Sequence, residues 1–183
     1  MNYLPKRFKQ NHVYCIDIYN EIVSLFKEIE KNNFLSVKYM PANNENSEEI
    51  LSLLGEELYK WLKINKHYRE LFEIEYKNCY AALFTDMLQY LLTSLQCSVK
   101  GQLNITYALL RKPLKDNLFY LEYLLADPIK FLESFNSEKD QELFAIEKIT
   151  KEKKIEIIRI VLSKIKYFPY SAEDLSLIHI SEP

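Results

Sequence analysis

The sequence predicts an all-α fold, an antiparallel bundle of about six or seven helices, on the strength of three observations. First, only two glycines and six prolines occur in 183 residues, too few turn formers for an all-β protein. Second, apolar residues return at steps of three and four, as on the buried face of a helix. Third, a chain of this length that is 48% hydrophobic can bury one sizeable core but hardly two, which predicts a single domain.

The first expected helix covers residues 12–31. One of its faces is apolar and consists of Ile16, Tyr19, Ile22, Val23, Phe26 and Ile29. A loop with Pro41 and several asparagines follows. Ser47 and the two glutamates after it suit the start of a second helix, because serine caps free N–H groups and acidic side chains favour the positive helix end. This helix is expected to run to about Ile64.

A long helix is expected over residues 68–99. Its second half is apolar nearly all round, so it should be the central helix of the bundle. Residues 78–99 carry a single charge, Asp86, and are long enough to cross a bilayer. However, an aspartate near mid-span would cost about 2.5–3.5 kcal/mol, and Gln89 and Gln96 dilute the hydrophobicity further. No membrane insertion is therefore expected.

The next helix is expected over residues 102–127, with a kink near residues 109–113 because Pro113 removes a hydrogen bond and clashes with the preceding turn. Its apolar stripe consists of Leu103, Tyr107, Leu110, Leu114, Leu118, Leu121 and Leu125. Later helices should begin at the capping residues Asp127, Ser137 and Thr150.

The chain ends in LSLIHISEP, residues 175–183. Although Ser171 is placed to cap a further helix, these nine residues resemble the in-frame translation of a sequencing-library adapter. We therefore expect residues 1–174 to form a single helical domain and residues 175–183 to be a non-native tail. The native protein would then continue past Asp174, and the truncated bundle should expose an apolar strip.

Few side chains could carry catalysis or bind a metal. Apart from His179 in the tail there are two histidines, His12 and His67, and neither belongs to an HExxH or Glu-x-x-His motif. Two isolated glycines cannot build a Walker or GxGxxG loop. The sequence thus predicts no metal site, no cofactor and no catalytic residue in the visible chain.

The cysteines and the amino-terminal residues bear on the cellular compartment. Cys15, Cys79 and Cys97 are odd in number and form no CxxC motif, which predicts buried free thiols and a reducing cytoplasm. The first residues also lack the apolar segment of a secretory signal. The abundance of Lys, Asn, Ile and Tyr is typical of AT-rich bacterial genomes.

The most informative polar residues lie in the leucine-rich helix. They are Asn104, Arg111, Lys115, Asn117 and Glu122. Arg111 has apolar neighbours, and a buried guanidinium needs a carboxylate partner because its desolvation is costly. Asp86 is the natural partner. Two interpretations stay open: an ion pair that fixes the register of two helices, or an Arg111 that lines a cleft and binds a ligand phosphate or carboxylate.

Residues 148–166 form a basic segment, with seven Lys or Arg against Glu152 and Glu156. Such a segment could contact the RNA backbone, although the net charge of −2 gives no general attraction to nucleic acid. The same segment has an apolar face made of Ile158, Val161, Leu162, Ile165 and Phe168. We therefore favour an amphipathic helix with a solvated basic face.

Two resemblances add to these observations. The stretch ITYALLRKPLKDNLFYLEYLLADP resembles a helix of uncharacterised bacterial all-helical proteins. It is also loosely similar to the HEPN class of helical ribonucleases and toxins, whose Arg-x4-6-His motif forms the cleavage site. Asn117 stands at the histidine position that follows Arg111. The HEPN resemblance implies a metal-independent ribonuclease, of the kind used in phage defence, whose catalytic histidine is absent from the visible chain.

The function expected from the sequence is therefore a helical-bundle protein that binds a ligand or a partner without catalysis. A HEPN-like ribonuclease is the alternative. The partner could be a second copy of the chain, another protein or, with less support, RNA.

Overall fold

The computed structural model describes residues 4–39, 50, 52–53, 55–136, 146–166 and 169–179. These ranges contain helices and no strand, which confirms the all-α prediction. The longer helices are α1 (Lys6–Lys31), α3 (Glu56–Ile64), α4 (Tyr68–Val99), α5 (Leu103–Arg111), α6 (Leu118–Ala126), α7 (Pro128–Asn136), α8 (Lys151–Ser163) and α9 (Ala172–His179). The π-helix η1 (Lys112–Asn117) joins α5 to α6, and η2 (Ile146–Lys148) is a short 3-10 turn. With α5–η1–α6 counted as one rod, the described part agrees with the predicted six or seven helices.

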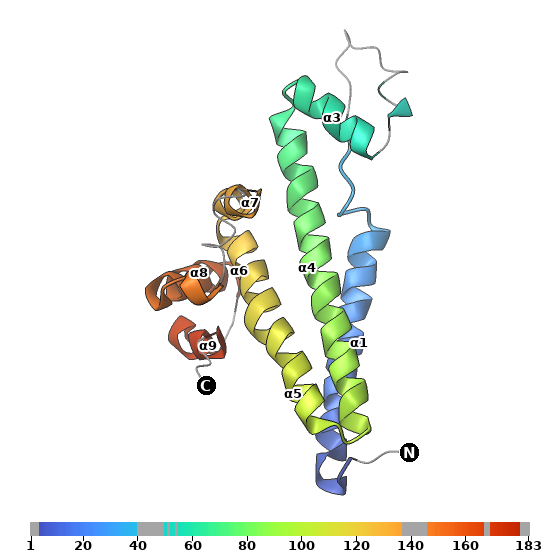
Figure 1. The fold of residues 1–183 in the computed structure, drawn as a ribbon, viewed down its shortest axis with the longest axis vertical. Helices are drawn as coiled ribbons and strands as arrows, with labels where there is room; N and C mark the ends of the chain where they lie inside the picture. The colour runs from blue at the N-terminus through green and yellow to red at the C-terminus, as the bar shows by residue number, and fades with distance from the viewer. Residues whose placement is uncertain are drawn as a thin grey trace.

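The helix α4 is the centre of the molecule and has the predicted bounds. It contacts α1, α3, α5, η1, α6 and α7. Figure 1 shows α1 on one side of α4 and the α5–η1–α6 rod on the other, with α6 diverging from α4 and carrying α8 and α9 on its far side. None of the helices in the described ranges is long and apolar enough to span a membrane.

Two helix starts differ from the sequence prediction. The first helix begins at Lys6, directly after Pro5, rather than near His12. The second was expected from Ser47, which lies outside the described residues. Ile50 is helical, but Gly55 has a φ of 56°, a left-handed conformation that glycine adopts without a steric penalty. This residue interrupts the expected helix, so that α3 begins at Glu56.

The rod passes Pro113 without ending. A proline inside an α-helix removes one hydrogen bond and clashes with the carbonyl one turn earlier, and we expected a kink for that reason. In the structure, residues 112–117 adopt the wider π-helical pattern, in which the Leu118 N–H donates to the Pro113 carbonyl five residues back. The wider turn makes room for the proline ring, and it shifts which side chains of the rod face α4.

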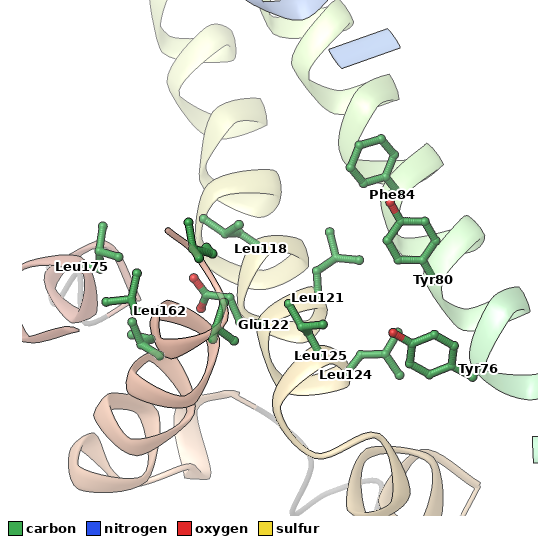
Figure 2. A pocket seen from close by; sticks show the side chains of 13 residues that line it. Tyr76, Tyr80, Phe84, Leu118, Leu121, Glu122, Leu124, Leu125, Leu162 and Leu175 are labelled. Atoms are coloured by element: carbon green, nitrogen blue, oxygen red, sulfur yellow. The ribbon is translucent and has the colours of Figure 1, made fainter. Parts of the chain in front are cut away.

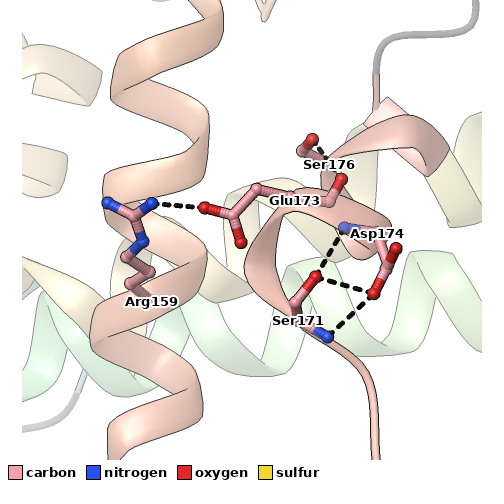
Figure 3. A network of polar contacts seen from close by, with 5 residues as sticks. All are labelled: Arg159, Ser171, Glu173, Asp174 and Ser176. Carbon is pink, nitrogen blue, oxygen red and sulfur yellow. Dashed lines mark hydrogen bonds and ion pairs between the residues drawn. The ribbon is translucent and has the colours of Figure 1, made fainter.

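Three of the predicted capping residues cap their helices. The Lys130 N–H donates to Asp127 at 3.2 Å, and the Lys153 N–H donates to the Thr150 hydroxyl at 3.3 Å. At α9, the Asp174 N–H donates to the Ser171 hydroxyl at 3.1 Å, and the Asp174 carboxylate accepts from Ser171 in return (Figure 3). Ser137 lies outside the described residues.

The buried core is concentrated around α6. One cluster joins Phe119 to Ile146 and Ile157, and another joins Leu124 to Phe131 and Leu132. The amphipathic prediction for the basic segment is confirmed in its centre, since Ile158 and Val161 of α8 are buried. Ile165 is exposed instead, and Phe168 lies outside the described residues.

The tail residues 175–179 are helical and belong to α9, which packs on α8. An ion pair between Arg159 and Glu173 links these two helices (Figure 3). Residues 180–183 lie outside the described part. The non-native origin of residues 175–183 stays a prediction, as does the boundary of the single domain at residue 174.

Candidate functional site

The main candidate site is an apolar cavity between α4, α6 and α8, with a volume of about 360 Å³. Its wall on α4 consists of Tyr76, Tyr80 and Phe84. The rest of its lining comes from α6, from α8 and the turn after it, and from α9, and consists of Leu118, Leu121, Glu122, Leu124, Leu125, Ile158, Val161, Leu162, Ile165 and Leu175. Figure 2 shows the three rings on α4 facing the leucines of α6 across the gap. The divergence of α6 from α4 opens this space.

The rings on α4 form an aromatic wall because they are spaced four residues apart and therefore share one helix face. Tyr80 stacks on Phe84 with ring centres 5.6 Å apart, and Phe84 is backed by Phe26 of α1 at 4.9 Å. Burial, and to a smaller extent Tyr76, raises the pKa of Tyr80. Its hydroxyl is therefore neutral at physiological pH and can donate a hydrogen bond.

Glu122 supplies the carboxylate of the cavity. It was a candidate ligand residue in the sequence, and it lies on α6 among the lining leucines. Figure 2 shows its carboxylate directed toward α8, beside Leu162. The cavity thus combines a largely aliphatic wall with a carboxylate and two tyrosine hydroxyls, the combination of apolar walls and few polar groups found in small-molecule sites.

A polar cluster lies farther along α4, where η1 packs on it. Lys112 Nζ lies 2.9 Å from Asp86 Oδ2, 3.3 Å from the Tyr90 hydroxyl and 4.4 Å from the centre of the Tyr90 ring. Asn117 is almost fully buried and donates to the same Asp86 oxygen at 2.9 Å and to the Leu83 carbonyl at 3.3 Å. These contacts fix the position of η1 along α4.

The predicted pairing of Asp86 with Arg111 is wrong in its cation. Arg111 is exposed, not buried, and Lys112 is the cation at Asp86. Of the other candidates, the structure brings Asn117 to Asp86, places Glu122 in the cavity and leaves Asn104 exposed on α5. Sequence reasoning missed Lys112, although it is adjacent to Arg111. Adjacent residues of a helix point about 100° apart, so only one of the two side chains can face α4.

The Asp86–Lys112 contact predicts a specific pH dependence of stability. Partial burial would raise the pKa of Asp86, but the hydrogen bonds from Asn117 and Lys112 and the charge of Lys112 outweigh it, so that the pKa lies below 3.8. The hydrogen bond to Asp86 likewise raises the pKa of Lys112 above 10.5. The Asp86–Lys112 ion pair therefore stabilises the fold between pH 3.8 and pH 10.5. It is lost as pH falls through the lowered pKa of Asp86 or rises through the raised pKa of Lys112.

Asp86→Asn should lower the free energy of unfolding at pH 7 by about 1 kcal/mol, because both side chains are 43% exposed and such pairs are weak. Urea unfolding should show this difference shrinking below pH 3.8, where Asp86 becomes protonated. Asp17→Asn, on the exposed surface of α1, is the control and should change little at any pH. A constant deficit for Asp86→Asn down to pH 2 would contradict the assignment.

The remaining candidate groups are dispersed. Cys15 is exposed, contrary to the expected burial, while Cys79 and Cys97 are half-buried free thiols. Burial, and next the charge of Glu75, raises the pKa of Cys79, which disfavours the reactive thiolate. His67 stacks on Trp61 and contacts the Tyr39 hydroxyl at 3.3 Å. Within the described ranges, no three His, Cys, Asp or Glu side chains come together as a metal site.

The sequence matches no protein-family model, and no curated protein or solved structure shows significant similarity to it. The resemblances to uncharacterised helical proteins and to the HEPN class therefore stay predictions.

Proposed function

We propose that the protein binds a small apolar molecule that carries a hydrogen-bond-donating head group. The observation that carries this proposal is the 360 Å³ cavity between α4, α6 and α8, a volume within the range of small-molecule sites. The aromatic wall and the leucines of α6 offer an apolar ligand a large contact surface, and its burial there provides the driving force. Glu122 selects the head group, because a carboxylate accepts hydrogen bonds and prefers a cation.

A displacement assay tests this proposal. Nile red is expected to fluoresce in the cavity, and dodecylamine should displace it at least about tenfold more effectively than dodecanoate, because an ammonium head pairs with Glu122 whereas a carboxylate head is repelled. Glu122→Gln should remove this preference and leave the affinity for dodecanol unchanged within about threefold.

Leu121→Trp should fill the cavity and weaken dye binding at least about tenfold. Ile129→Trp introduces the same side chain on α7, at a position that is 59% exposed and outside the cavity, and should bind like the native chain. Equal dye binding by Leu121→Trp and the native protein would contradict the proposal.

The ribonuclease alternative has less support. Asn117, which occupies the histidine position of the HEPN motif, is buried and bonded to Asp86 and the Leu83 carbonyl. Arg111 is exposed and is not the cation at Asp86. His12 lies on α1, and His67 directly precedes α4.

A further inference from the structure

Two exposed apolar stripes run along α1 and α5. The α1 stripe consists of Tyr14, Ile18 and Leu25, and the α5 stripe of Leu103, Tyr107 and Leu114, the last at the start of η1. These six side chains are between 45% and 71% exposed. The spacing is the same in both stripes, four residues and then seven, so each spans about 16 Å along its helix axis. Such spacing is typical of a seam between packed helices.

Both stripes face the same side of α4. On that helix, α1 contacts Phe84 through Phe26, and η1 contacts Asp86 through Asn117. Around the axis of α4, each residue is rotated by about 100° from the one before it. Met87 and Leu91, which are half-buried, therefore point between the side of α4 that contacts α1 and the side that contacts η1.

The stripes are turned toward Met87 and Leu91 from either flank. Tyr107 is turned by about 100° from Thr106, whose hydroxyl contacts the Ser94 carbonyl of α4. On α1, Phe26 points at α4, where it contacts Phe84. Leu25 precedes Phe26, so it is rotated about the helix axis by the same angle in the opposite sense. Because α1 and α5 pack on different sides of α4 and run in the same direction (Figure 1), opposite turns bring both stripes to one face.

The stripes also lie at the same level along α4. Phe26 contacts Phe84 and Asn117 contacts Leu83, so these two residues of α1 and η1 are level. Counting back along both helices places Tyr14 and Leu103 within about one helical turn of each other. A two-fold axis parallel to the helices therefore lays the α1 stripe of one copy on the α5 stripe of another, in register.

The charges beside the stripes are complementary in this arrangement. Glu21 lies within the α1 stripe, between Ile18 and Leu25, and Arg111 flanks the α5 stripe one turn from Tyr107. Both are exposed. In the two-fold arrangement Glu21 of one copy lies beside Arg111 of the other, and the contact occurs twice, as an isologous interface requires.

The equal spacing of the two stripes and the opposite charges of Glu21 and Arg111 make this face complementary to itself, which favours a second copy over an unlike partner. We propose that the chain forms a two-fold homodimer in which the α1 stripe of each copy packs on the α5 stripe of the other.

Sedimentation velocity of the full chain at 1–100 μM tests the dimer. The native chain is expected at twice 21.9 kDa. Ile18→Glu and Tyr107→Glu should each raise the dissociation constant at least about 100-fold, because a charge enters the apolar seam. Ile105→Glu is the matched control: it lies on α5 with 49% exposure but on the opposite side of the helix, and should change the constant less than about threefold. Circular dichroism verifies that each variant is folded.

A charge swap provides a second test that keeps every apolar contact. Glu21→Arg and Arg111→Glu should each weaken the dimer about tenfold or more, and the double variant should regain the native constant within about threefold. A native chain that stays monomeric at 100 μM overturns the proposal and leaves the face to another occupant, such as a continuation of the chain or a different protein. A dimer insensitive to Ile18→Glu and Tyr107→Glu overturns it as well.

Discussion

Phe119→Ala is expected to lower the free energy of unfolding by about 3–5 kcal/mol, the range for removing a large side chain from a core. Phe119 has no exposed surface and packs against Ile146 and Ile157, with Tyr123 beside it. It therefore joins α6 to η2 and α8, and its removal leaves a cavity at the centre of this contact. Since a domain of this size is stable by only about 5–15 kcal/mol, urea unfolding followed by circular dichroism should show a much lower midpoint.

Phe34→Ala is the matched control, because Phe34 is 66% exposed. Its substitution should change the free energy of unfolding by less than about 0.5 kcal/mol. A loss below about 1 kcal/mol for Phe119→Ala would mean that α6 and α8 do not pack through this residue.

Asn117→Ala is expected to cost about 2–3 kcal/mol of stability. The Asn117 side chain is 2% exposed and donates to the charged Asp86 carboxylate and to the Leu83 carbonyl. Alanine removes both hydrogen bonds, leaves the carbonyl without this donor, and opens a small cavity. Thermal or urea unfolding at pH 7 measures the loss.

Two comparisons separate this effect from a general sensitivity of the rod. Asn104→Ala makes the same change at an exposed position of α5 and should be nearly neutral. In an Asp86→Asn background, Asn117→Ala should cost less than in the native chain by at least about 0.5 kcal/mol, because the two side chains are in contact. Strictly additive losses would show that the hydrogen bond contributes nothing.

The sequence predicted best the features that depend on neighbouring residues. The bounds of α4 and the caps at Asp127, Thr150 and Ser171 agree with the structure. A cap requires only a side-chain oxygen two or three residues before a free N–H group, and a long helix requires only a continuous run of suitable residues without glycine or proline. Such signals are fully contained in the segment that they describe.

The partner of Asp86 could not be predicted in the same way. Adjacent helix residues point about 100° apart, so the choice between Arg111 and Lys112 depends on the exact phase of the rod against α4. The π-helical pattern of η1 changes this phase at Pro113, and the sequence indicates only that the proline perturbs the helix. The position of Gly55 had a similar consequence, since a single left-handed residue moved the start of α3.

The cavity and the apolar face depend on how the rods diverge, which no local pattern encodes. The predicted stripe from Leu103 to Leu125 is continuous in the sequence, yet Leu103, Tyr107 and Leu114 are exposed, while Leu118 and Leu121 line the cavity. The spacing of Tyr76, Tyr80 and Phe84 was the one available signal for the aromatic wall. It indicated a shared helix face but not what lay opposite.

The central claim is that α4 holds in place both the cavity wall and the face formed by the α1 and α5 stripes. Amide hydrogen exchange along α4 tests this claim most directly. The slowest exchange in the chain is expected over residues 76–91, where α4 contacts α1, η1 and α6 together, and much faster exchange is expected in α9. Exchange over residues 76–91 that is as fast as in α9 would contradict it.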